Sequence, residues 1–241
     1  MSEATTGRSV LITGGNRGIG LAIAKAFLAN GDKVAITSRS EVTDLPAGIL
    51  AVKADVTDEA SVDAAFKEVE AAHGPVEVLV ANAGITKDTL LLRMSEDDFT
   101  SVLDTNLTGA FRVLKRASKG MIRLKKGRVV LISSVVGLYG SPGQINYASS
   151  KSGLVGMARS LTRELGARNI TANVVAPGYV NTEMTDVLPE ETKDQYMKAI
   201  PAGRFCEPEE IANVVRWVAS DEASYISGAV IPVDGGLGMG H

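Results

Sequence analysis

The pattern that most restricts the fold of this chain lies near its N-terminus, where a strand, a glycine-rich turn, a helix and a second strand follow one another. Residues 9–13 are typical of a short buried strand, and a glycine cluster at residues 14–20 comes directly after it. An alanine-rich helical pattern covers residues 21–30 and stops at Gly31, a typical helix C-cap. With a further strand at residues 33–38, this order predicts a βαβ unit whose parallel strands are joined by a right-handed crossover.

The same alternation continues along the rest of the chain. Further strands are predicted at residues 49–53, 76–81, 128–133, 170–175 and 229–233. Further helices are predicted at residues 58–72, 95–124, 147–168 and 208–220. This pattern predicts an α/β fold, a Rossmann-type doubly wound parallel sheet of about seven strands with helices on both faces.

Composition favours one domain. The chain has 241 residues, of which 45% are hydrophobic and 22% charged, and a chain of this size can bury a sizeable core. Since no repeat, low-complexity tract or linker divides it, we expect a single domain over residues 1–241. Residues 181–205 lack a strong periodicity, and we interpret them as a mobile or inserted segment on the substrate side.

Charge and cysteine content exclude several classes of function. The net charge of −3 gives no global basic field for nucleic acid or an anionic membrane, although a local basic patch is compatible with that sum. Cys206 is the only cysteine, so neither an internal disulfide nor a cysteine-based metal cluster can form, and we predict no metal site. Residues 1–7 are polar and no apolar run is long enough to span a bilayer. We therefore expect a cytoplasmic protein.

The glycine turn is a candidate phosphate site. A helix N-terminus offers unpaired N–H groups and a positive dipole end, and glycines allow the backbone to approach a pyrophosphate closely. The glycines at 14, 18 and 20 do not match the usual G-x-G-x-x-G spacing of dinucleotide sites. A glycine-rich turn that binds no ligand is the alternative.

The end of the second strand favours NADP over NAD. An NAD site usually carries an acid near this point, but residues 37–40 contain none. Arg39, together with Arg17 in the glycine turn, can instead pair with a 2′-phosphate. A solvated loop arginine is the alternative for Arg39. Asp55 can accept a hydrogen bond from the adenine amine, or it can serve as a turn or cap residue.

Tyr147 and Lys151 are candidates for acid–base chemistry. Their spacing of four residues puts them on one face of a helix, one turn apart. A lysine ammonium beside a phenol favours the phenolate and lowers the pKa of the tyrosine, so that the pair can exchange a proton with a substrate oxygen. A Tyr and a Lys at this spacing are also common on solvated helix faces, which is the alternative.

Several short motifs of this chain resemble, in their order and spacing, those of the short-chain dehydrogenase/reductase family. The motifs are Thr13-Gly14-x-x-x-Gly18-x-Gly20, Asn82-Ala83-Gly84, Asn106, Ser134, Tyr147-x-x-x-Lys151 and Pro177-Gly178. Each motif is weak alone, but the ordered set extends over essentially the whole chain. The resemblance therefore favours the functional interpretation of Tyr147 and Lys151.

The resemblance implies a role for each of four polar residues. Tyr147 would donate the proton to a carbonyl oxygen, to which Ser134 would also hydrogen-bond. Ser133 is adjacent, and the spacing found in the family selects Ser134. Lys151 would bind the nicotinamide ribose and lower the pKa of Tyr147. Asn106 would hold a water molecule in a proton relay, although without the resemblance it would be interpreted as a capping or helix-kink residue.

The resemblance also implies an NADPH site that runs from the glycine turn to the Pro177-Gly178 segment. Asn82 and Gly84 match the turn against the adenosine ribose, and Val180 and Thr182 match residues near the nicotinamide carboxamide. The predicted cofactor-binding residues are Gly14, Asn16, Arg17, Gly18, Ile19, Gly20, Ser38, Arg39, Asp55, Val56, Asn82, Gly84, Tyr147, Lys151, Pro177, Gly178, Val180 and Thr182.

Within the family, residues 85–94 and 227–236 are similar to segments of 3-oxoacyl-[acyl-carrier-protein] reductases, and the Gly-Met-Gly-His ending at 238–241 is similar to bacterial members. This likeness implies the NADPH-dependent reduction of a 3-oxoacyl chain on acyl carrier protein to the 3-hydroxyacyl form, in fatty acid synthesis. An acetoacetyl-CoA reductase or a polyketide ketoreductase is the main alternative. A non-catalytic NADP-binding sensor or a structural protein would have little reason to keep all four polar residues.

Two expectations concern partners. We expect a homotetramer built on the helices at 95–124 and 147–168, because the second helix carries a row of small residues that permits close helix approach. The row is Ala148, Ser152, Gly156 and Ser160, which could otherwise pack inside the subunit. Lys125 and Arg168 match basic residues that dock the acidic carrier protein in related reductases, and we expect them near the mouth of the active site. Complementing a helix dipole is the alternative for both.

Overall fold

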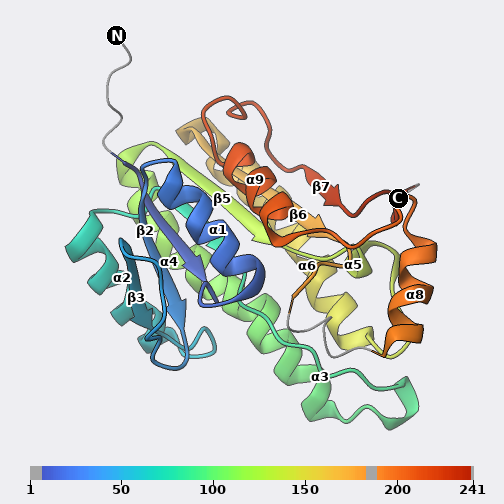
Figure 1. Cartoon of the computed structure of the whole chain (residues 1–241). Helices are drawn as coiled ribbons and strands as arrows, with labels where there is room; N and C mark the ends of the chain where they lie inside the picture. Colours follow the sequence, from blue (N-terminus) through green and yellow to red (C-terminus); the bar gives the residue numbers. More distant parts are fainter. Residues whose placement is uncertain (1–6, 183–188, 240–241) are drawn as a thin grey trace.

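The computed structural model describes residues 7–182 and 189–239, and seven parallel strands form one sheet in them (Figure 1). The strand order is β3-β2-β1-β4-β5-β6-β7. The strands are β1 (Ser9–Thr13), β2 (Lys33–Ser38), β3 (Ile49–Lys53), β4 (Val78–Ala81), β5 (Gly127–Ile132), β6 (Ile170–Pro177) and β7 (Val230–Val233). The predicted α/β fold with about seven parallel strands is confirmed.

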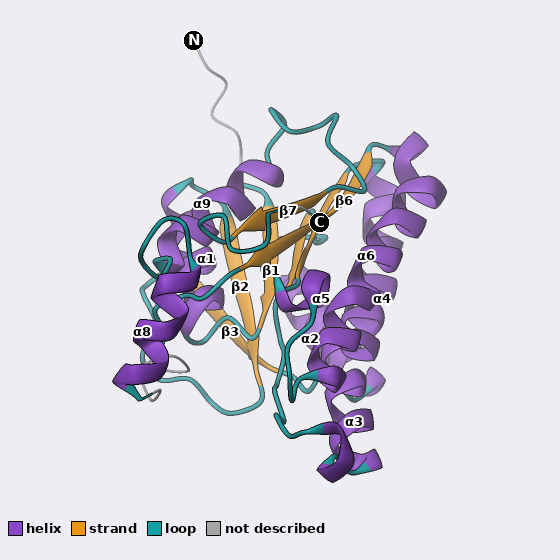
Figure 2. Cartoon of the chain, turned by 90° about the vertical axis from the view of Figure 1, so that its right-hand side faces the viewer, coloured by secondary structure: helices purple, strands orange, loops and turns teal. Residues whose placement is uncertain are grey.

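Helices cover both faces of the sheet, with α1 and α9 on one face and α4 and α6 on the other (Figure 2). The helices are α1 (Gly18–Ala29), α2 (Glu59–His73), α3 (Glu96–Leu103), α4 (Gly109–Leu124), α5 (Val136–Tyr139), α6 (Ile145–Leu165), α8 (Glu190–Ala199) and α9 (Pro208–Val218). None of the helices in the described residues is long and apolar enough to cross a lipid bilayer.

The central strands are largely apolar because both of their faces are buried, whereas the edge strands β3 and β7 are partly exposed. In β1, Val10 and Ile12 pack into a core with α1 and α9, whereas Leu11 packs into a second core with α2, α4 and α6. All five residues of β1 are buried, and so are all six of β5. Alternation along each strand therefore produces one hydrophobic core on each side of the sheet.

The sheet order fixes the place where a ligand can bind. The chain runs outward from β1 through β2 to β3, and then crosses to the other side of β1 to form β4. Such a reversal opens a crevice at the carboxyl ends of the strands, which is where doubly wound sheets bind their ligands. The glycine turn after β1 and the Asn82-Ala83-Gly84 turn after β4 meet at this point.

Two predicted elements need correction. The helix expected at residues 95–124 starts with a capping box of Ser95 and Asp98, but a π-helical turn, Asp104–Thr108, divides it into α3 and α4. The segment at 181–205, interpreted as mobile or inserted, contains α8, a helix that was not predicted. The residues of α8 are all at least partly exposed, so no buried stripe marks it in the sequence. Residues 183–188 of that segment lie outside the described part of the chain.

Candidate active site

The turn after β1 has the backbone of a phosphate cradle. Gly14 and Gly18 have φ values of +64° and +51°, which glycine adopts at little cost. A Cβ at Gly20 would lie only 2.2 Å from the carbonyl oxygen of Gly14, so the first turn of α1 packs against the turn with no room for a side chain. The unpaired N–H groups at the start of α1 therefore face the crevice at close range, an arrangement that fits a pyrophosphate.

The Asn82-Ala83-Gly84 turn supports the glycine turn from the neighbouring strand. The Asn82 side-chain amide donates to the carbonyl oxygens of Thr13, at 3.1 Å, and Gly14, at 2.9 Å. The Asn82 backbone N–H donates to the Thr13 hydroxyl at 3.0 Å. Asn82 thus holds the cradle in shape. A Cβ at Gly84 would lie 3.5 Å from Lys151 Nζ, so this turn also passes close to the catalytic candidates.

The segment after β6 lies next to the glycine turn. A Cβ at Gly18 would lie 3.5 Å from the Thr182 methyl group, so this segment faces the glycine turn directly. Val180 pairs with Cys206 in a β-bridge, and Gly178 packs against Asp234 so closely that a Cβ would lie 2.9 Å from its Cα. The structure therefore puts the 177–182 segment in direct contact with the glycine turn, so the predicted residues of the two segments lie together.

The residues predicted for the adenosine side of the cofactor lie at and just beyond the ends of β2 and β3. Ser38 is buried and Arg39 is exposed. The Asp55 carboxylate accepts hydrogen bonds from the Thr57 hydroxyl at 2.7 Å and from the Thr57 N–H at 2.9 Å. These bonds, and more weakly the positive charge of Arg39, lower the pKa of Asp55. Asp55 therefore forms the turn that was its alternative interpretation, and it lies within electrostatic reach of Arg39.

The structure distinguishes the two serines at the end of β5. The Ser133 hydroxyl is buried and donates to the backbone carbonyl of Lys151 at 3.0 Å. The Ser134 side chain is hydrogen-bonded to the Tyr147 hydroxyl and accepts the Val136 N–H at 3.2 Å. Ser134, the serine that the family spacing selects, is therefore the one that contacts Tyr147.

Lys151 lies directly behind Tyr147. Its ammonium nitrogen is 5.6 Å from the centre of the Tyr147 ring and donates to the carbonyl oxygen of Ile132 at 2.8 Å. Burial lowers the pKa of Lys151 to about 8. Because Lys151 is 4% exposed and bound to the end of β5, its position is fixed from both the sheet and the helix.

The electrostatics of Tyr147 differ from the expectation. Burial raises the pKa of Tyr147 to about 12, the hydrogen bond to Ser134 opposes this rise, and the negative charge of Asp88 adds to it. Lys151 was expected to lower this pKa, but the desolvation of the phenol dominates and the effect that lowers the pKa comes from Ser134. Tyr147 is thus held as a neutral phenol at ordinary pH, as an acid that donates a proton must be.

Asn106 lies in the π-helical turn between α3 and α4, in line with its interpretation as a helix-kink residue. Its side-chain oxygen accepts the Ile85 N–H at 2.8 Å, and its amide donates to the Ile85 carbonyl at 3.0 Å and to the Ser150 hydroxyl at 3.1 Å. Ser150 in turn donates to the carbonyl of Tyr147 at 2.7 Å. The Asn106 side chain therefore connects the segment after Gly84 to the helix that carries Tyr147.

Two buried polar residues of α6 were not singled out in the sequence. Asn146 and Ser150 are both 0% exposed, and they stand one residue before and three residues after Tyr147. The same helical spacing that groups Tyr147 with Lys151 puts Ser150 on the buried face of α6. Their polar character on that face was the signal that could have identified them.

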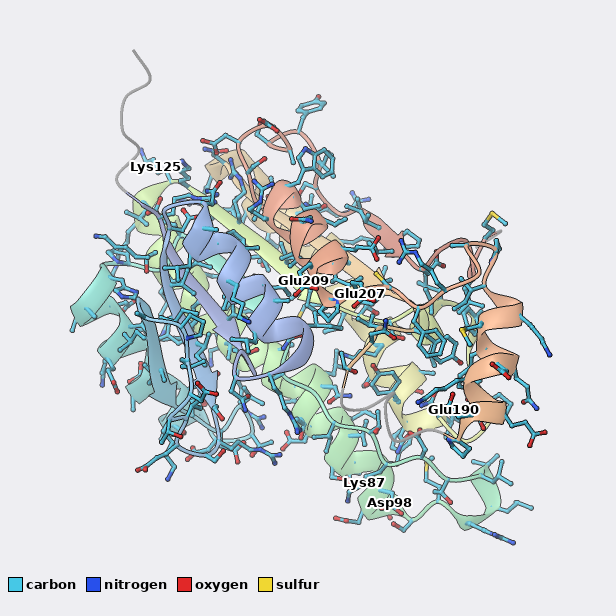
Figure 3. The ribbon with its side chains drawn as sticks, in the orientation of Figure 1. Lys87, Asp98, Lys125, Glu190, Glu207 and Glu209 are labelled. Carbon is cyan, nitrogen blue, oxygen red and sulfur yellow. The ribbon has the colours of Figure 1, made fainter. Side chains whose placement is uncertain are left out.

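The two predicted docking residues lie at the far edge of the sheet. Lys125 directly precedes β5 and Arg168 precedes β6, so both lie at the amino ends of these strands, whereas Ser134 and Tyr147 lie at the carboxyl ends. In Figure 3, Lys125 is at the opposite end of the molecule from Lys87 and Asp98. The expectation that both residues lie near the active-site mouth of their own subunit is wrong, because parallel strands put all their amino ends at one edge.

Comparisons with known proteins agree with this geometry. A family model described as enoyl-(acyl carrier protein) reductase matches residues 14–238. The 3-oxoacyl-[acyl-carrier-protein] reductase MabA of Mycobacterium tuberculosis (strain ATCC 25618 / H37Rv) is 57% identical over 97% of this chain and 94% of its own. The 3-oxoacyl-[acyl-carrier-protein] reductase FabG of Escherichia coli (strain K12) is 43% identical over 97% of this chain and 98% of its own. Matches of this extent show that the chain belongs to the short-chain dehydrogenase/reductase family.

Proposed function

We propose that this protein reduces a 3-oxoacyl chain on acyl carrier protein to the 3-hydroxyacyl form, with NADPH, in fatty acid synthesis. The hydrogen bond between Ser134 and Tyr147, with Lys151 buried behind the phenol, carries the proposal because it is a carbonyl-binding arrangement. The reductases MabA and FabG, which the chain resembles over nearly its whole length, support the choice of substrate. An acetoacetyl-CoA or polyketide ketoreductase has the same residues and is the alternative.

The residues of this chain account for the proton and for the oxyanion. Tyr147, whose pKa is about 12, is protonated at neutral pH and can donate its proton to the carbonyl oxygen. The Ser134 hydroxyl is a second donor to that oxygen as negative charge develops on it. Lys151, with a pKa near 8, lies behind Tyr147 and can return a proton to the phenol. When bound, NADPH supplies the hydride.

Membership of the family implies a nicotinamide cofactor, and we assign it as NADPH rather than NADH. The glycine turn, in which a Cβ at Gly20 would fill the space beside Gly14, would hold the pyrophosphate. Residues 37–40 at the end of β2 contain no acid to bind a ribose 2′-hydroxyl, whereas Arg39 is exposed there and can pair with a 2′-phosphate. Arg17, at the start of α1, is the second candidate partner. The single cysteine supports a cytoplasmic location.

We assign Asn106 a supporting role in the proton relay. Its side-chain oxygen and amide are already bonded to Ile85 and Ser150. A π-helical turn interrupts the regular hydrogen-bond pattern and leaves backbone carbonyls available to bind water. The proposed water would therefore be held by the backbone of this turn, and the Asn106 side chain would fix the turn in place.

We propose a homotetramer whose subunits meet through α4 and α6. Three members of the small-residue row, Ser152, Gly156 and Ser160, are exposed, so the row does not pack inside the subunit. Nothing lies within 4 Å of a Cβ placed at Gly156, and Phe111 on α4 is 50% exposed. A hollow of about 550 Å³, lined in part by Ala148 and Ser152, continues this surface. A two-fold contact between helices of this kind is a common arrangement.

The same tetramer suggests a role for Lys125 and Arg168, which lie far from the active site of their own subunit. Arg168 is about 30 Å along the helix from Tyr147, at 1.5 Å per residue, so it cannot serve the mouth of its own subunit. A two-fold axis that pairs α6 helices in antiparallel fashion brings the end of one helix to the beginning of its partner. We therefore assign Lys125 and Arg168 to docking the acidic carrier for the partner subunit's active site, by charge attraction that salt weakens.

A substrate panel tests the proposed function. Oxidation of NADPH and NADH is followed with 3-oxoacyl chains of several lengths, each linked to acyl carrier protein or to CoA. We expect the highest kcat/KM with NADPH and a carrier-linked chain. A preference for CoA-linked acetoacetate would favour the alternative reductase. Absence of turnover with every substrate, despite NADPH binding, would identify a sensor and contradict the proposal.

A further inference from the structure

Asn146 links three parts of the active-site region from a completely buried position. Its amide donates to the carbonyl oxygens of Lys87, at 2.9 Å, and Asp98, at 3.2 Å. Its side-chain oxygen accepts the backbone N–H of Tyr147 at 2.8 Å. Asn146 is 0% exposed. A single side chain therefore joins the segment after the Asn82-Ala83-Gly84 turn, helix α3 and the residue that carries the phenol.

The bond to Tyr147 replaces a missing helix cap. The first N–H groups of a helix have no partner within the helix, and Tyr147 is the third residue of α6. The N-cap residue Gln144 makes no side-chain capping bond and donates to Asp88 at 2.7 Å instead. The Asn146 side chain is therefore the hydrogen-bond acceptor of the Tyr147 N–H, and it fixes the position of the first turn of α6.

The segment around Lys87, to which Asn146 is bonded, also makes contacts closer to the surface. Lys87 forms ion pairs with Asp97 at 3.2 Å and with Asp98 at 3.6 Å, and Figure 3 shows Lys87 and Asp98 side by side on the surface. The Thr89 N–H donates to the carbonyl of Gly143 at 2.8 Å. These outer contacts are solvent-exposed and individually weak, so the buried amide of Asn146 makes the stronger connection.

We propose that Asn146 is a positioning residue for the reduction, one that keeps the Tyr147 hydroxyl against Ser134. The proposal rests on the proposed role of Tyr147 as proton donor. The hydrogen bonds of the Asn146 side chain all go to backbone atoms and not to the phenol hydroxyl. Asn146 acts on the reaction only by setting where the first turn of α6 lies. Displacement of a reacting group by about 1 Å can cost about 100-fold in rate.

Two variants and a matched control test this role. Asn146→Ala removes all three hydrogen bonds, whereas Asn146→Asp keeps the acceptor for Tyr147 and loses the two donated bonds. Asn173 is the control, because it is also 0% exposed, donates to the carbonyl of Ile226 at 2.8 Å and accepts the Ala229 N–H at 3.1 Å, on a different part of the sheet. Asn173→Ala therefore reproduces the loss of a buried asparagine without touching Tyr147.

The first measurement is kinetic. We expect Asn146→Ala to lower kcat about 100-fold, with KM for NADPH within about two-fold of wild type. Asn146→Asp should lower kcat by at least as much, because its carboxylate would face the carbonyl oxygens of Lys87 and Asp98 in a buried site. Asn173→Ala should keep kcat within about two-fold. In the double variant Asn146→Ala/Ser134→Ala, kcat should fall by clearly less than the product of the two single-variant losses, because both residues act on the contact between Tyr147 and Ser134. A structural role alone would give independent, multiplicative losses.

The second measurement needs no substrate. Amide hydrogen exchange in Asn146→Ala should speed up in the peptides that cover residues 85–98 and 145–149, and it should stay unchanged there in Asn173→Ala. If the wild-type protein shows no turnover, the proposed function is refuted. The hydrogen-exchange rates would then still show whether Asn146 holds residues 85–98 and the start of α6 in place. Multiplicative losses in kcat, unchanged exchange, or failure of both Asn146 variants to fold while Asn173→Ala folds would overturn the positioning role.

Discussion

Among single residues, Ser133 and Ser134 are adjacent but have different partners, and this difference can be measured. Ser134→Ala removes a donor to the developing oxyanion, so we expect kcat to fall about 100-fold. Ser133→Ala removes a buried hydrogen bond to Lys151, so we expect a loss of about 1 kcal/mol of stability and a much smaller change in kcat. Steady-state kinetics and urea unfolding of both variants check this, and equal losses of kcat would contradict the assignment of Ser134.

The buried ammonium of Lys151 predicts a pH dependence of stability. Its pKa is about 8 in the folded protein and 10.5 in the reference state, so between these values the unfolded chain binds a proton that the folded chain lacks. Stability therefore rises with pH across this window. We expect the wild type to gain about 2 kcal/mol relative to Lys151→Met between about pH 7.5 and 9.5. Urea unfolding at the two pH values measures this gain, and a constant or reversed difference would contradict it.

Residue identities were predictable from the sequence, but their environments were not. Spacing and resemblance selected Ser134, Tyr147 and Lys151, and the structure brings these three together at the end of β5. The pKa of Tyr147 depends on how deeply the phenol is buried, which no local pattern encodes. Asn146 was missed for a related reason, since its three partners are brought together only by the folded chain.

At the scale of elements, the close packing of the turn between β1 and α1 predicts that a methyl group added at Gly20 weakens cofactor binding. In Gly20→Ala the new Cβ would lie 2.2 Å from the carbonyl of Gly14 and 2.7 Å from the Asn82 amide, so the turn or the helix must move. We expect at least a 10-fold loss of NADPH affinity and a lower Tm, which fluorescence titration and thermal unfolding measure. Gly166→Ala is the control, because nothing lies within 4 Å of its Cβ. Unchanged affinity in Gly20→Ala would contradict the cradle.

Elements with a clear periodicity were predicted well, and those without one were not. The bounds of β1, β2 and β3 match the prediction. The strands β1 and β2 are almost entirely buried and stand out as apolar runs, and β3 is a short, mostly apolar edge strand. Helix α8 was missed because it contributes no buried residue and is held through the stacking of Tyr196 on Tyr179, at 4.2 Å between ring centres. The π-helical turn was missed because one extra residue barely disturbs a helical pattern.

At the scale of the whole molecule, the exposed row of small residues on α6 predicts that a charged side chain placed there disrupts the tetramer. Gly156→Glu places a carboxylate on the proposed interface, so we expect dissociation of the tetramer, measured by light scattering. If docking acts across subunits, the same variant should raise KM for carrier-linked substrate more than for a CoA-linked analogue. Ala72→Glu adds the same charge to an exposed position of α2 and should change neither property. A monomeric wild type, or an intact Gly156→Glu tetramer, would contradict the proposed interface.

Topology explains what sequence proximity could not. Lys125 and Arg168 are close in sequence to the strand and helix that carry Ser134 and Tyr147, which suggested a shared location. Each of them nevertheless precedes its strand, and the amino and carboxyl ends of a parallel sheet lie at opposite edges. Their distance from the site follows directly from strand direction, whereas any contact with a partner subunit depends on surfaces that one chain does not define.

The most direct test of the proposed reaction is the Tyr147→Phe variant, which removes the phenolic hydroxyl and keeps the ring. NADPH binding is measured by fluorescence and turnover is measured with a carrier-linked 3-oxoacyl substrate, alongside wild type. We expect the variant to bind NADPH with an affinity close to wild type and to lose essentially all turnover, because no other described group is placed to donate the proton beside Ser134. Turnover near the wild-type rate in Tyr147→Phe would contradict the assignment of Tyr147 as the acid.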